Sequence, residues 1–151
     1  MTDEIAPRLR IAQVFLLSAT FRHRGEPLSL PHTTPVMPQR INVGFQLRSL
    51  NDSKAAQILV KVESAPEEGE DSRYEFAVEM TAILEKEGDT TAPPALLEIG
   101  AALLYPFVRE VVANLTGRGR FGPVWLNPFN VRAAIKAQTA AETQQPAEAT
   151  P

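Results

Sequence analysis

The sequence contains no cysteine, which excludes a disulfide framework, a thiolate nucleophile and a cysteine-based metal site. It also lacks a long hydrophobic run, because its longest apolar stretches fall far short of the roughly 20 residues that a membrane-spanning helix needs. Neither charge is in large excess: 15 basic and 18 acidic side chains leave a net charge of -3. This balance gives no broad attraction to nucleic acid or to an anionic membrane surface. The first residues are acidic and no apolar run follows them, so we expect no signal peptide and a cytoplasmic protein.

Groups that carry enzyme chemistry are also scarce. The two histidines, His23 and His32, have no carboxylate or cysteine motif beside them, which makes them poor metal ligands and poor bases for a nucleophile. Gly117, Gly119 and Gly122 spell a GxGxxG motif, but it follows an expected helix and precedes a proline-containing loop. A dinucleotide site needs the motif between a strand and a helix. We therefore predict no catalytic site, no metal and no cofactor, and we do not expect an enzyme.

What the chain does contain is a series of alternating apolar and polar runs, within a length of 151 residues that suits one domain. Such alternation is typical of β-strands, and it covers residues 10–23, 39–50, 55–63 and 74–84. Short polar turns join the last three runs, whereas residues 24–38 form a long connection rich in proline. Strands with hairpin-length connections predict an antiparallel sheet, and its apolar face must be covered.

The first of these runs is apolar on both sides. Strict alternation would place Phe15, Leu17 and Phe21 on one face, and Val14 and Leu16 on the other. Large apolar side chains on both faces indicate cover on both sides of the strand or contact with another subunit. An ordinary central strand of the sheet would explain the pattern equally well.

After the last strand, the period of the apolar residues changes from two to that of a helix. The pattern predicts a helix over residues 95–116, started by Pro93-Pro94 and ended by Gly117 as a C′ residue. Pro106 lies inside this helix, where proline removes a hydrogen bond and clashes with the preceding turn. We therefore expect a kink near residues 102–105, or two helical pieces.

A second, shorter helix and a tail are expected at the end of the chain. Apolar residues at helical spacing predict the helix from Pro128 to about Lys136. From Ala137 onward the residues are almost all Ala, Thr, Gln, Glu and Pro, which offer too little apolar surface to fold. We therefore expect a disordered tail over residues 137–151, and a flexible N-terminus over residues 1–9.

The loop between the two predicted helices, residues 118–128, is unusually apolar. It contains the only tryptophan of the chain, Trp125, between Pro123 and Pro128. Apolar side chains in an irregular segment either close the core or form the wall of a surface that binds extended, apolar polypeptide. Such binding rests on apolar area removed from water, at about 25 cal/mol per Å², so it tolerates many peptide sequences.

Three pieces of sequence in this region have the order and the approximate spacing of a known family. They are Leu104-Tyr105-Pro106-Phe107-Val108-Arg109-Glu110, Arg118-Gly119-x-Phe121 and Leu126-x-Pro128-x-Asn130. With weaker agreement over residues 11–136, the chain resembles SecB, the bacterial protein-export chaperone, and the SecB-like chaperones. The resemblance implies an α+β fold in which a four-stranded antiparallel β-sheet carries two C-terminal helices on one face. It places the chaperone domain at residues 10–136 and makes residues 24–38 a crossover loop beside a peptide groove.

For function, the resemblance implies an ATP-independent holdase chaperone. Such a protein binds unfolded or non-native polypeptides in an apolar groove and keeps them soluble for protein export. The family forms a homotetramer, a dimer of dimers with the long helices between the dimers, which implies an oligomer interface at Leu103, Phe107, Val111 and Leu115. The expected groove residues are Phe45, Tyr74, Phe76, Leu84, Phe121, Val124, Trp125, Leu126 and Phe129. Arg109 and Glu110 would be structural residues that pair near the helix interface.

The resemblance leaves the partners open. SecB delivers its clients to the SecA motor through acidic and apolar residues on the outer surface of the sheet. At the matching positions this chain carries Ser18, Arg22, Glu75 and Ala77, in which acidic residues are lost and Glu75 replaces an apolar one. These replacements argue against normal SecA docking, so one alternative is a SecB-like chaperone dedicated to an antitoxin of a toxin–antitoxin system.

Two further alternatives do not depend on the resemblance. A small-ligand-binding domain would need a closed pocket with convergent polar groups, and no such group stands out in the sequence. A purely structural oligomerisation domain would bury its apolar loop completely.

Overall fold

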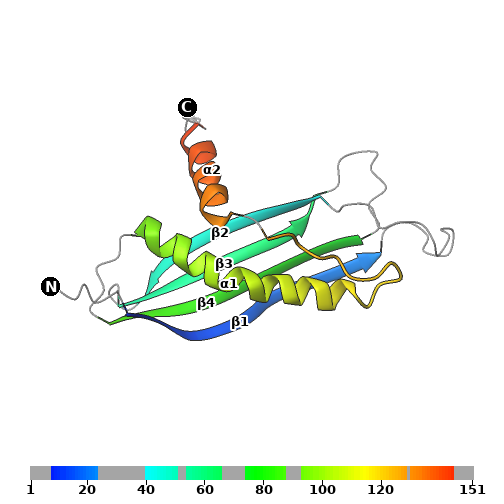
Figure 1. The fold of residues 1–151 in the computed structure, drawn as a ribbon, viewed down its shortest axis with the longest axis horizontal. Helices are drawn as coiled ribbons and strands as arrows, with labels where there is room; N and C mark the ends of the chain where they lie inside the picture. The colour runs from blue at the N-terminus through cyan, green and yellow to red at the C-terminus, as the bar shows by residue number, and fades with distance from the viewer. Residues whose placement is uncertain are drawn as a thin grey trace, which may run out of the picture.

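The structure is a computed structural model, and it describes residues 8–23, 40–50, 54–65, 74–87, 93–128 and 130–144. Within these residues, four strands are followed by two helices (Figure 1): β1 (Arg8–His23), β2 (Ile41–Leu50), β3 (Ala55–Ser64), β4 (Tyr74–Glu87), α1 (Pro93–Thr116) and α2 (Val131–Gln144). The predicted fold class is confirmed: it is α+β, with a four-stranded antiparallel sheet and two C-terminal helices.

The strand order in the sheet is β1-β4-β3-β2, and each neighbouring pair is antiparallel. β2, β3 and β4 follow one another as hairpins, as predicted, whereas β1 lies beside β4 and not beside β2. The chain must therefore cross from one edge of the sheet to the other between His23 and Ile41. Residues 24–38, the predicted crossover loop, lie outside the described residues. This topology makes β1 and β2 the two edge strands.

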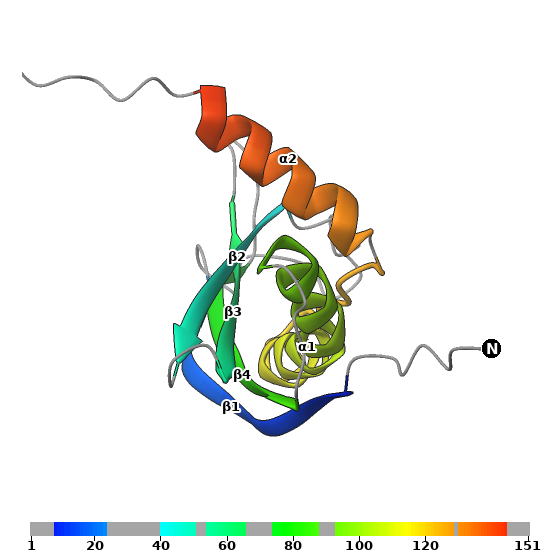
Figure 2. The ribbon, with the colours of Figure 1, turned by 90° about the vertical axis from the view of Figure 1, so that its left-hand side faces the viewer.

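The face of the sheet toward α1 forms the core. Gly100 brings the helix backbone close to the sheet, since a Cβ atom here would lie 2.4 Å from Ile58 Cγ1. Figure 2 shows α1 lying against one face of the sheet. The side chains that are fully shielded from solvent come from β3, β4 and α1, and include Ile58, Val60, Val62, Val78, Leu84, Leu104, Val108 and Val112.

β1 departs from the strict alternation that its sequence predicts. Its pairing with β4 shifts register between Ile11 and Gln13 and again between Leu16 and Ser18, which marks two β-bulges. As a result Leu16 lies opposite Met80, toward α1, while Phe15 lies opposite Thr81, toward the outer face. The predicted grouping of Phe15 with Phe21 is therefore wrong, because each bulge adds a residue and exchanges the faces of those that follow.

α1 is one continuous helix with Pro106 inside it, so the alternative of two helical pieces is wrong. Figure 1 shows its axis changing direction along its length. The helix ends before Gly117, as predicted, and the Gly117 amide donates a hydrogen bond to the Ala113 carbonyl at 2.9 Å. The left-handed backbone conformation belongs to Gly122, with φ of 80°, where L side chains are strained.

α2 differs from its prediction at both ends. It begins at Val131 because Asn130 caps it: Asn130 Oδ1 accepts a hydrogen bond from the Ala133 amide at 3.1 Å. It continues to Gln144, so residues 137–144, which we expected in the disordered tail, are helical. Ala, Gln and Glu are good helix formers, and the buried Ile135 anchors the helix to the core.

Candidate functional site

The loop that follows α1 is fixed at its first half by Tyr74 of β4. The Tyr74 hydroxyl donates a hydrogen bond to the Gly122 carbonyl at 2.9 Å and accepts one from the Phe121 amide at 2.8 Å. Gly119 lies so close to the Tyr74 ring that an added Cβ would come within 2.6 Å of it. The Tyr74 ring also contacts the rings of Phe21, His23 and Phe121, with centroids 5.2–6.0 Å apart. Two of the three glycines of the GxGxxG motif, Gly119 and Gly122, thus serve loop packing.

The second half of the loop is fixed by α1. Arg109 Nε donates to the Leu126 carbonyl at 2.8 Å, and the Tyr105 hydroxyl donates to the Asn127 carbonyl at 2.9 Å. Burial raises the pKa of Tyr105 above its usual value, and the nearby Arg109 guanidinium partly opposes this effect. Arg109 is therefore structural, as expected, but it holds the loop and does not pair with Glu110.

Between these two anchors the loop holds Trp125 out into solvent. The amide of Val124 donates to Thr116 Oγ1 at 2.8 Å, and the side chains of Val124 and Leu126 point inward, at 8% and 3% exposed. Trp125, between them, is 70% exposed. The hydrogen bonds on both sides fix the backbone of the loop, which presents the large aromatic side chain of Trp125 to solvent. The loop therefore loses little conformational entropy when a partner binds to this side chain.

The predicted groove residues separate into two groups. Six of them are buried in the single chain and form its core beneath the loop and sheet: Phe45, Tyr74, Phe76, Leu84, Val124 and Leu126. Phe121 is half-buried and Trp125 is exposed, whereas Phe129 lies outside the described residues. Among the predicted groove residues that the structure describes, Trp125 is the one that offers a large apolar surface in this conformation.

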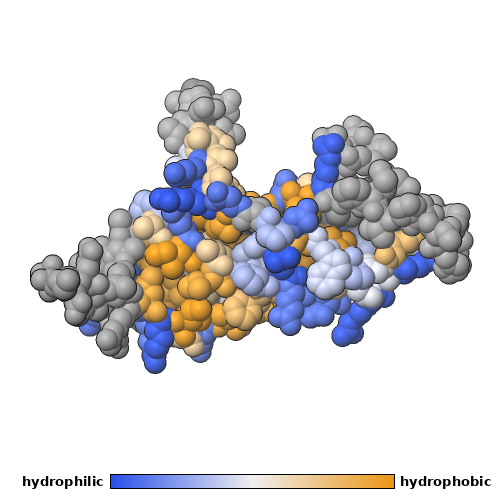
Figure 3. Space-filling view, viewed as in Figure 1, coloured by the Kyte–Doolittle hydropathy of each residue, from blue (hydrophilic) through white to orange (hydrophobic). Residues whose placement is uncertain are grey.

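A second apolar surface runs along α1. Leu103 and Phe107, two of the predicted interface residues, are 41% and 43% exposed, while Val111 and Leu115 are half-buried against the core. Ile99, one turn earlier, is 39% exposed and extends the same row. Figure 3 shows an extensive apolar surface over the N-terminal half of α1. The interface expected from the sequence did not include Ile99, although its spacing of four residues from Leu103 places both residues on one face of a helix.

The edge strand β1 adds further exposed apolar side chains. Ile11, Phe15, Leu16 and Leu17 are 39–45% exposed. They do not share one face of the sheet, because the two bulges change the direction of the side chains along the strand. Ile11 and Leu16 face the α1 side, opposite Leu84 and Met80, but α1 does not cover them. Because these residues flank an open sheet edge, the whole strand has the character of an interface.

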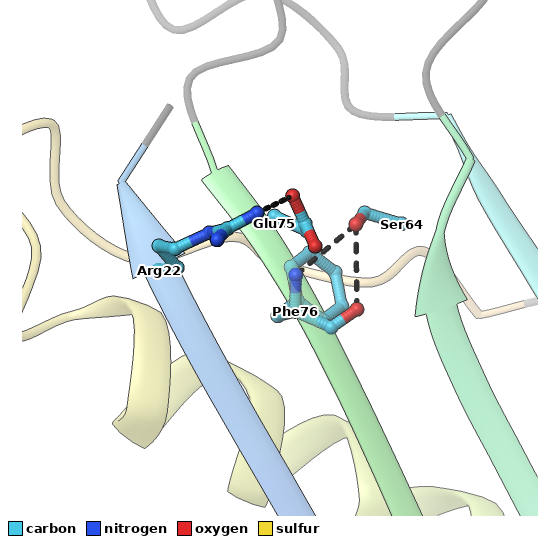
Figure 4. A network of polar contacts seen from close by, with 4 residues as sticks. All are labelled: Arg22, Ser64, Glu75 and Phe76. Carbon is cyan, nitrogen blue, oxygen red and sulfur yellow. Dashed lines mark hydrogen bonds and ion pairs between the residues drawn. The ribbon is translucent and has the colours of Figure 1, made fainter. Parts of the chain in front are cut away.

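The outer face of the sheet carries charges of both signs. Arg22 of β1 and Glu75 of β4, at two of the positions matched to SecA contacts, form an ion pair of 2.9 Å (Figure 4). Lys61 and Glu63 of β3 form a second pair of 3.4 Å. Close by, Ser64 Oγ bridges the β3–β4 pairing by contacting both the amide and the carbonyl of Phe76 (Figure 4). The carboxylates of this face are therefore partly neutralised by neighbouring cations.

At the opposite edge of the sheet, α2 contacts β2 at Phe45. The side-chain amide of Gln138 accepts a hydrogen bond from the Phe45 amide at 3.1 Å and donates one to the Phe45 carbonyl at 3.0 Å. Figure 2 shows α2 passing over this edge of the sheet. From the sequence we expected Gln138 in the tail, and a single polar residue on an exposed helix gives no local signal of such a contact.

Two open hollows accompany these surfaces. One, of about 440 Å³, lies between α1 and the start of α2 and is lined by Glu98, Tyr105, Arg109 and Arg132 among others. The other, of about 400 Å³, lies beside Gln138 on the outer face of the sheet. In the part of the chain that the structure describes, no helix is long and apolar enough to cross a membrane, and no three His, Asp or Glu side chains gather as metal ligands.

Comparison with curated proteins identifies relatives over almost the whole chain. The protein-export protein SecB of Acidithiobacillus ferrooxidans is 27% identical over 146 residues, which cover 95% of both chains. The protein-export protein SecB of Alcanivorax borkumensis is 28% identical over 142 residues, which cover 91% of this chain and 90% of the relative.

Among solved structures, the chain is similar to the SecB-like chaperone Rv1957 of Mycobacterium tuberculosis, which was solved in complex with a ChAD peptide from the Rv1956 HigA1 antitoxin. The TM-score is 0.59 at 20% sequence identity, covering 81% of this chain and 91% of that one. At this identity the likeness shows a shared fold. The family model described as preprotein translocase subunit SecB matches residues 2–142, and the chain therefore belongs to the SecB family.

Proposed function

We propose that this protein is an ATP-independent holdase that binds unfolded polypeptides and keeps them soluble for export. The SecB family is a family of protein-export chaperones and not of enzymes. The observation that carries the mechanism is Trp125, 70% exposed on a loop that Tyr105, Arg109 and Tyr74 hold in place. An exposed, pre-positioned aromatic side chain is a typical anchor for apolar segments of a partner.

The proposed client surface begins at Trp125 and Phe121 and extends over the neighbouring loop. Contact there would remove apolar area from water, a force without direction or sequence preference. Such a surface suits a chaperone that meets many unfolded chains and needs no nucleotide to bind them. The proposal places the protein in the cytoplasm, where precursors are met before they cross the membrane.

We further propose that the protein works as a homotetramer, a dimer of dimers. The support is the amount of apolar side chain left exposed in a single chain: Ile99, Leu103 and Phe107 on α1, and Ile11, Leu16 and Leu17 on β1. Monomeric proteins rarely expose apolar patches of this extent. One surface belongs to a helix and the other to a sheet edge, so two different contacts between chains would bury them.

A second candidate function is that of a chaperone dedicated to one antitoxin. The favouring observation is the outer face of the sheet, where Arg22 pairs with Glu75 and Lys61 with Glu63. A face of mixed, paired charges is a poor match for a partner that recognises a field of negative charge. The SecB-like Rv1957 chaperone was solved with an antitoxin peptide, which makes this client class reasonable for a protein of the same fold.

The test is suppression of aggregation. A chemically denatured protein is diluted into buffer with increasing amounts of this chain, without ATP, and light scattering is followed. We expect suppression that saturates near one client per four chains. Trp125→Ala should weaken client binding by about 1–2 kcal/mol, or roughly 5–30-fold. Stability should change little, because the ring is mostly in solvent already.

Lys136→Ala, on the exposed surface of α2, is the matched control and should suppress aggregation like the wild type. Absence of suppression at excess wild-type protein would reject the general holdase. Binding of a single antitoxin segment in that case would favour the dedicated chaperone.

A further inference from the structure

The contact between Gln138 and Phe45 has the form of a main-chain pairing. In an antiparallel sheet, a residue that faces an open edge presents its N–H and its C=O to the next strand, which answers with one acceptor and one donor. The carboxamide of Gln138 supplies both: Oε1 accepts from the Phe45 amide at 3.1 Å, and Nε2 donates to the Phe45 carbonyl at 3.0 Å. One side chain of α2 thus occupies one position of a missing fifth strand.

The remaining outward positions of β2 follow from the register. The Arg40 carbonyl accepts from the Ala65 amide, so Arg40 and the even-numbered residues of β2 pair with β3. Phe45 and the other odd-numbered residues, such as Val43 and Leu47, direct their main-chain groups away from the sheet. These groups form a row along the outer edge, and Gln138 contacts its centre.

Gln138 also holds the outer half of α2. Up to residue 142, Ile135 is the last residue of the helix that is buried in the core, and Lys136, Ala137 and residues 139–142 are exposed. Gln138 itself is half-buried, with Glu142 one turn further along the helix 3.4 Å from its Nε2 atom. Release of this one side chain would therefore free the row on β2 without unpacking Ile135.

The space beside the contact is suited to a bound strand. The hollow of about 400 Å³ is lined by Gly44, Gln46, Leu59 and Gln138 among others. A Cβ atom added to Gly44 would meet nothing within 4 Å, so the sheet surface next to the edge is open. An extended segment added to β2 could place alternate side chains into this hollow.

We propose that Gln138 is a displaceable substitute for a client strand: an extended segment of an unfolded client pairs with the outer edge of β2 and replaces the Gln138 carboxamide at Phe45. The inference rests on the proposed holdase function and adds a main-chain component to it. Hydrogen bonds to main-chain groups are available in every polypeptide, so this component is as tolerant of sequence as apolar burial. Gln138 keeps the main-chain groups of Phe45 satisfied between clients, and a helix at the centre of the edge hinders unspecific pairing of the strand.

The first measurement is site-resolved amide hydrogen exchange of the full-length protein. In Gln138→Ala, the Phe45 amide loses its acceptor and should exchange about 10-fold faster, as expected for the loss of about 1.4 kcal/mol of local protection. Gln138→Glu keeps an acceptor but loses the donor to the Phe45 carbonyl, and should show an intermediate increase. Alanine is a good helix former, so α2 should remain helical. Lys136→Ala is the control and should leave the Phe45 amide unchanged.

The second measurement uses a pair of peptides. The probe is a 13-residue peptide of alternating valine and threonine with lysines at both ends. Its partner has the same side chains but two consecutive central amides N-methylated, which removes one donor from each edge of the strand. Gln138→Ala should bind the first peptide about 3–10-fold more tightly than the wild type, because no substitute has to be displaced. It should bind the methylated peptide no more tightly than the wild type does.

Addition of the first peptide to Gln138→Ala should also restore slow exchange at Phe45. The proposal fails if peptide binds but leaves Phe45 exchange in this variant fast, since the peptide then lies elsewhere. It also fails if Gln138→Ala raises the affinity for both peptides equally, since the main chain of the peptide then has no part in binding. If neither peptide binds the wild type or the variant and aggregation is not suppressed, it is the holdase function that fails.

Discussion

The two edges of the sheet are treated in opposite ways. β1 is 16 residues long, carries two bulges, and exposes Ile11, Leu16 and Leu17 beside an edge that α1 leaves uncovered. β2 is 10 residues long and has its outward main-chain groups at Phe45 closed by Gln138 of α2. Open edges invite pairing with other chains, and natural proteins cover or disrupt them. Here one edge is contacted at its centre by the protein's own helix, and the other exposes apolar side chains without such a contact in the described residues.

The comparison teaches that exposure alone does not assign a function to an edge. At β1 the exposed groups are large apolar side chains on both faces, which only a permanent, well-packed contact can bury. At β2 the exposed groups are mainly main-chain donors and acceptors, which a reversible partner can satisfy one at a time. This difference in chemistry supports the two proposals made above, subunit assembly at β1 and exchangeable client binding at β2.

The largest expected effect is at β1. Leu16→Lys places a charge on a side chain that is 45% exposed in the single chain, so the fold should survive. In the proposed assembly the change removes the burial of a leucine and adds the desolvation of an ammonium group, at a cost of about 3 kcal/mol or more. Self-association should weaken on the order of 100-fold, as measured by sedimentation velocity over a range of concentrations.

The matched control introduces the same charge at the other edge. Ser49→Lys, on an exposed position of β2, should leave the sedimentation behaviour unchanged. Equal loss of assembly in both variants would mean that the two edges do not differ in the way described, and that β2 also contacts another subunit.

The next largest effect is expected from a substitution that detaches α2 from β2. Ile135 is 6% exposed and anchors the helix to the core, so Ile135→Ala should cost about 2–4 kcal/mol. The helix should then detach before the sheet unfolds, and exchange of the Phe45 amide should rise sharply in hydrogen-exchange measurements. Amides of β1 that pair with β4 should exchange as in the wild type. An equal rise in amide exchange at both edges would indicate global unfolding, and would show that α2 does not protect β2 alone.

The alternation of apolar and polar residues was sufficient to predict most of the sheet. It did not predict the bulges of β1 or the helix that contacts β2. The alternating runs at 55–63 and 74–84 correspond to β3 and β4, because these strands have a clear apolar face. β1 has apolar residues on both faces, and a strand of this kind does not fix its own register, so its bulges were not predictable. The helical end of α2 was missed because a contact with β2, and not an apolar stripe, holds it.

The same limit applies to the candidate site. The sequence drew attention to the apolar loop, but it did not separate the buried Val124 and Leu126 from the exposed Trp125 between them. That separation depends on the carbonyl contacts made by Tyr105 and Arg109, which lie 17–22 residues earlier in the chain. Phe45, Tyr74 and Phe76 were also expected in the groove, whereas their location on the α1 side of the sheet buries them.

The smallest expected effect concerns the loop that leads into α2. The Tyr105 hydroxyl donates to the Asn127 carbonyl at 2.9 Å, just before the Asn130 cap of the helix. Tyr105→Phe keeps the buried ring and removes this hydrogen bond, which should lower the free energy of unfolding by about 0.5–1.5 kcal/mol. Denaturant titration measures this loss, and Phe45 exchange should rise slightly while β1 is unaffected.

The pH dependence of the same side chain tests the cause. Burial raises the pKa of Tyr105 above its ordinary value of 10.0, so the folded protein favours the neutral hydroxyl. Its contribution to stability is therefore complete below about pH 10 and is lost as the pH rises through the higher folded pKa. The difference in stability between the wild type and Tyr105→Phe should be constant from pH 7 to 9 and shrink above pH 10. A difference that stayed constant through this range would show that the pKa of Tyr105 is the same in the folded and the unfolded protein, and that burial does not disfavour its ionised form.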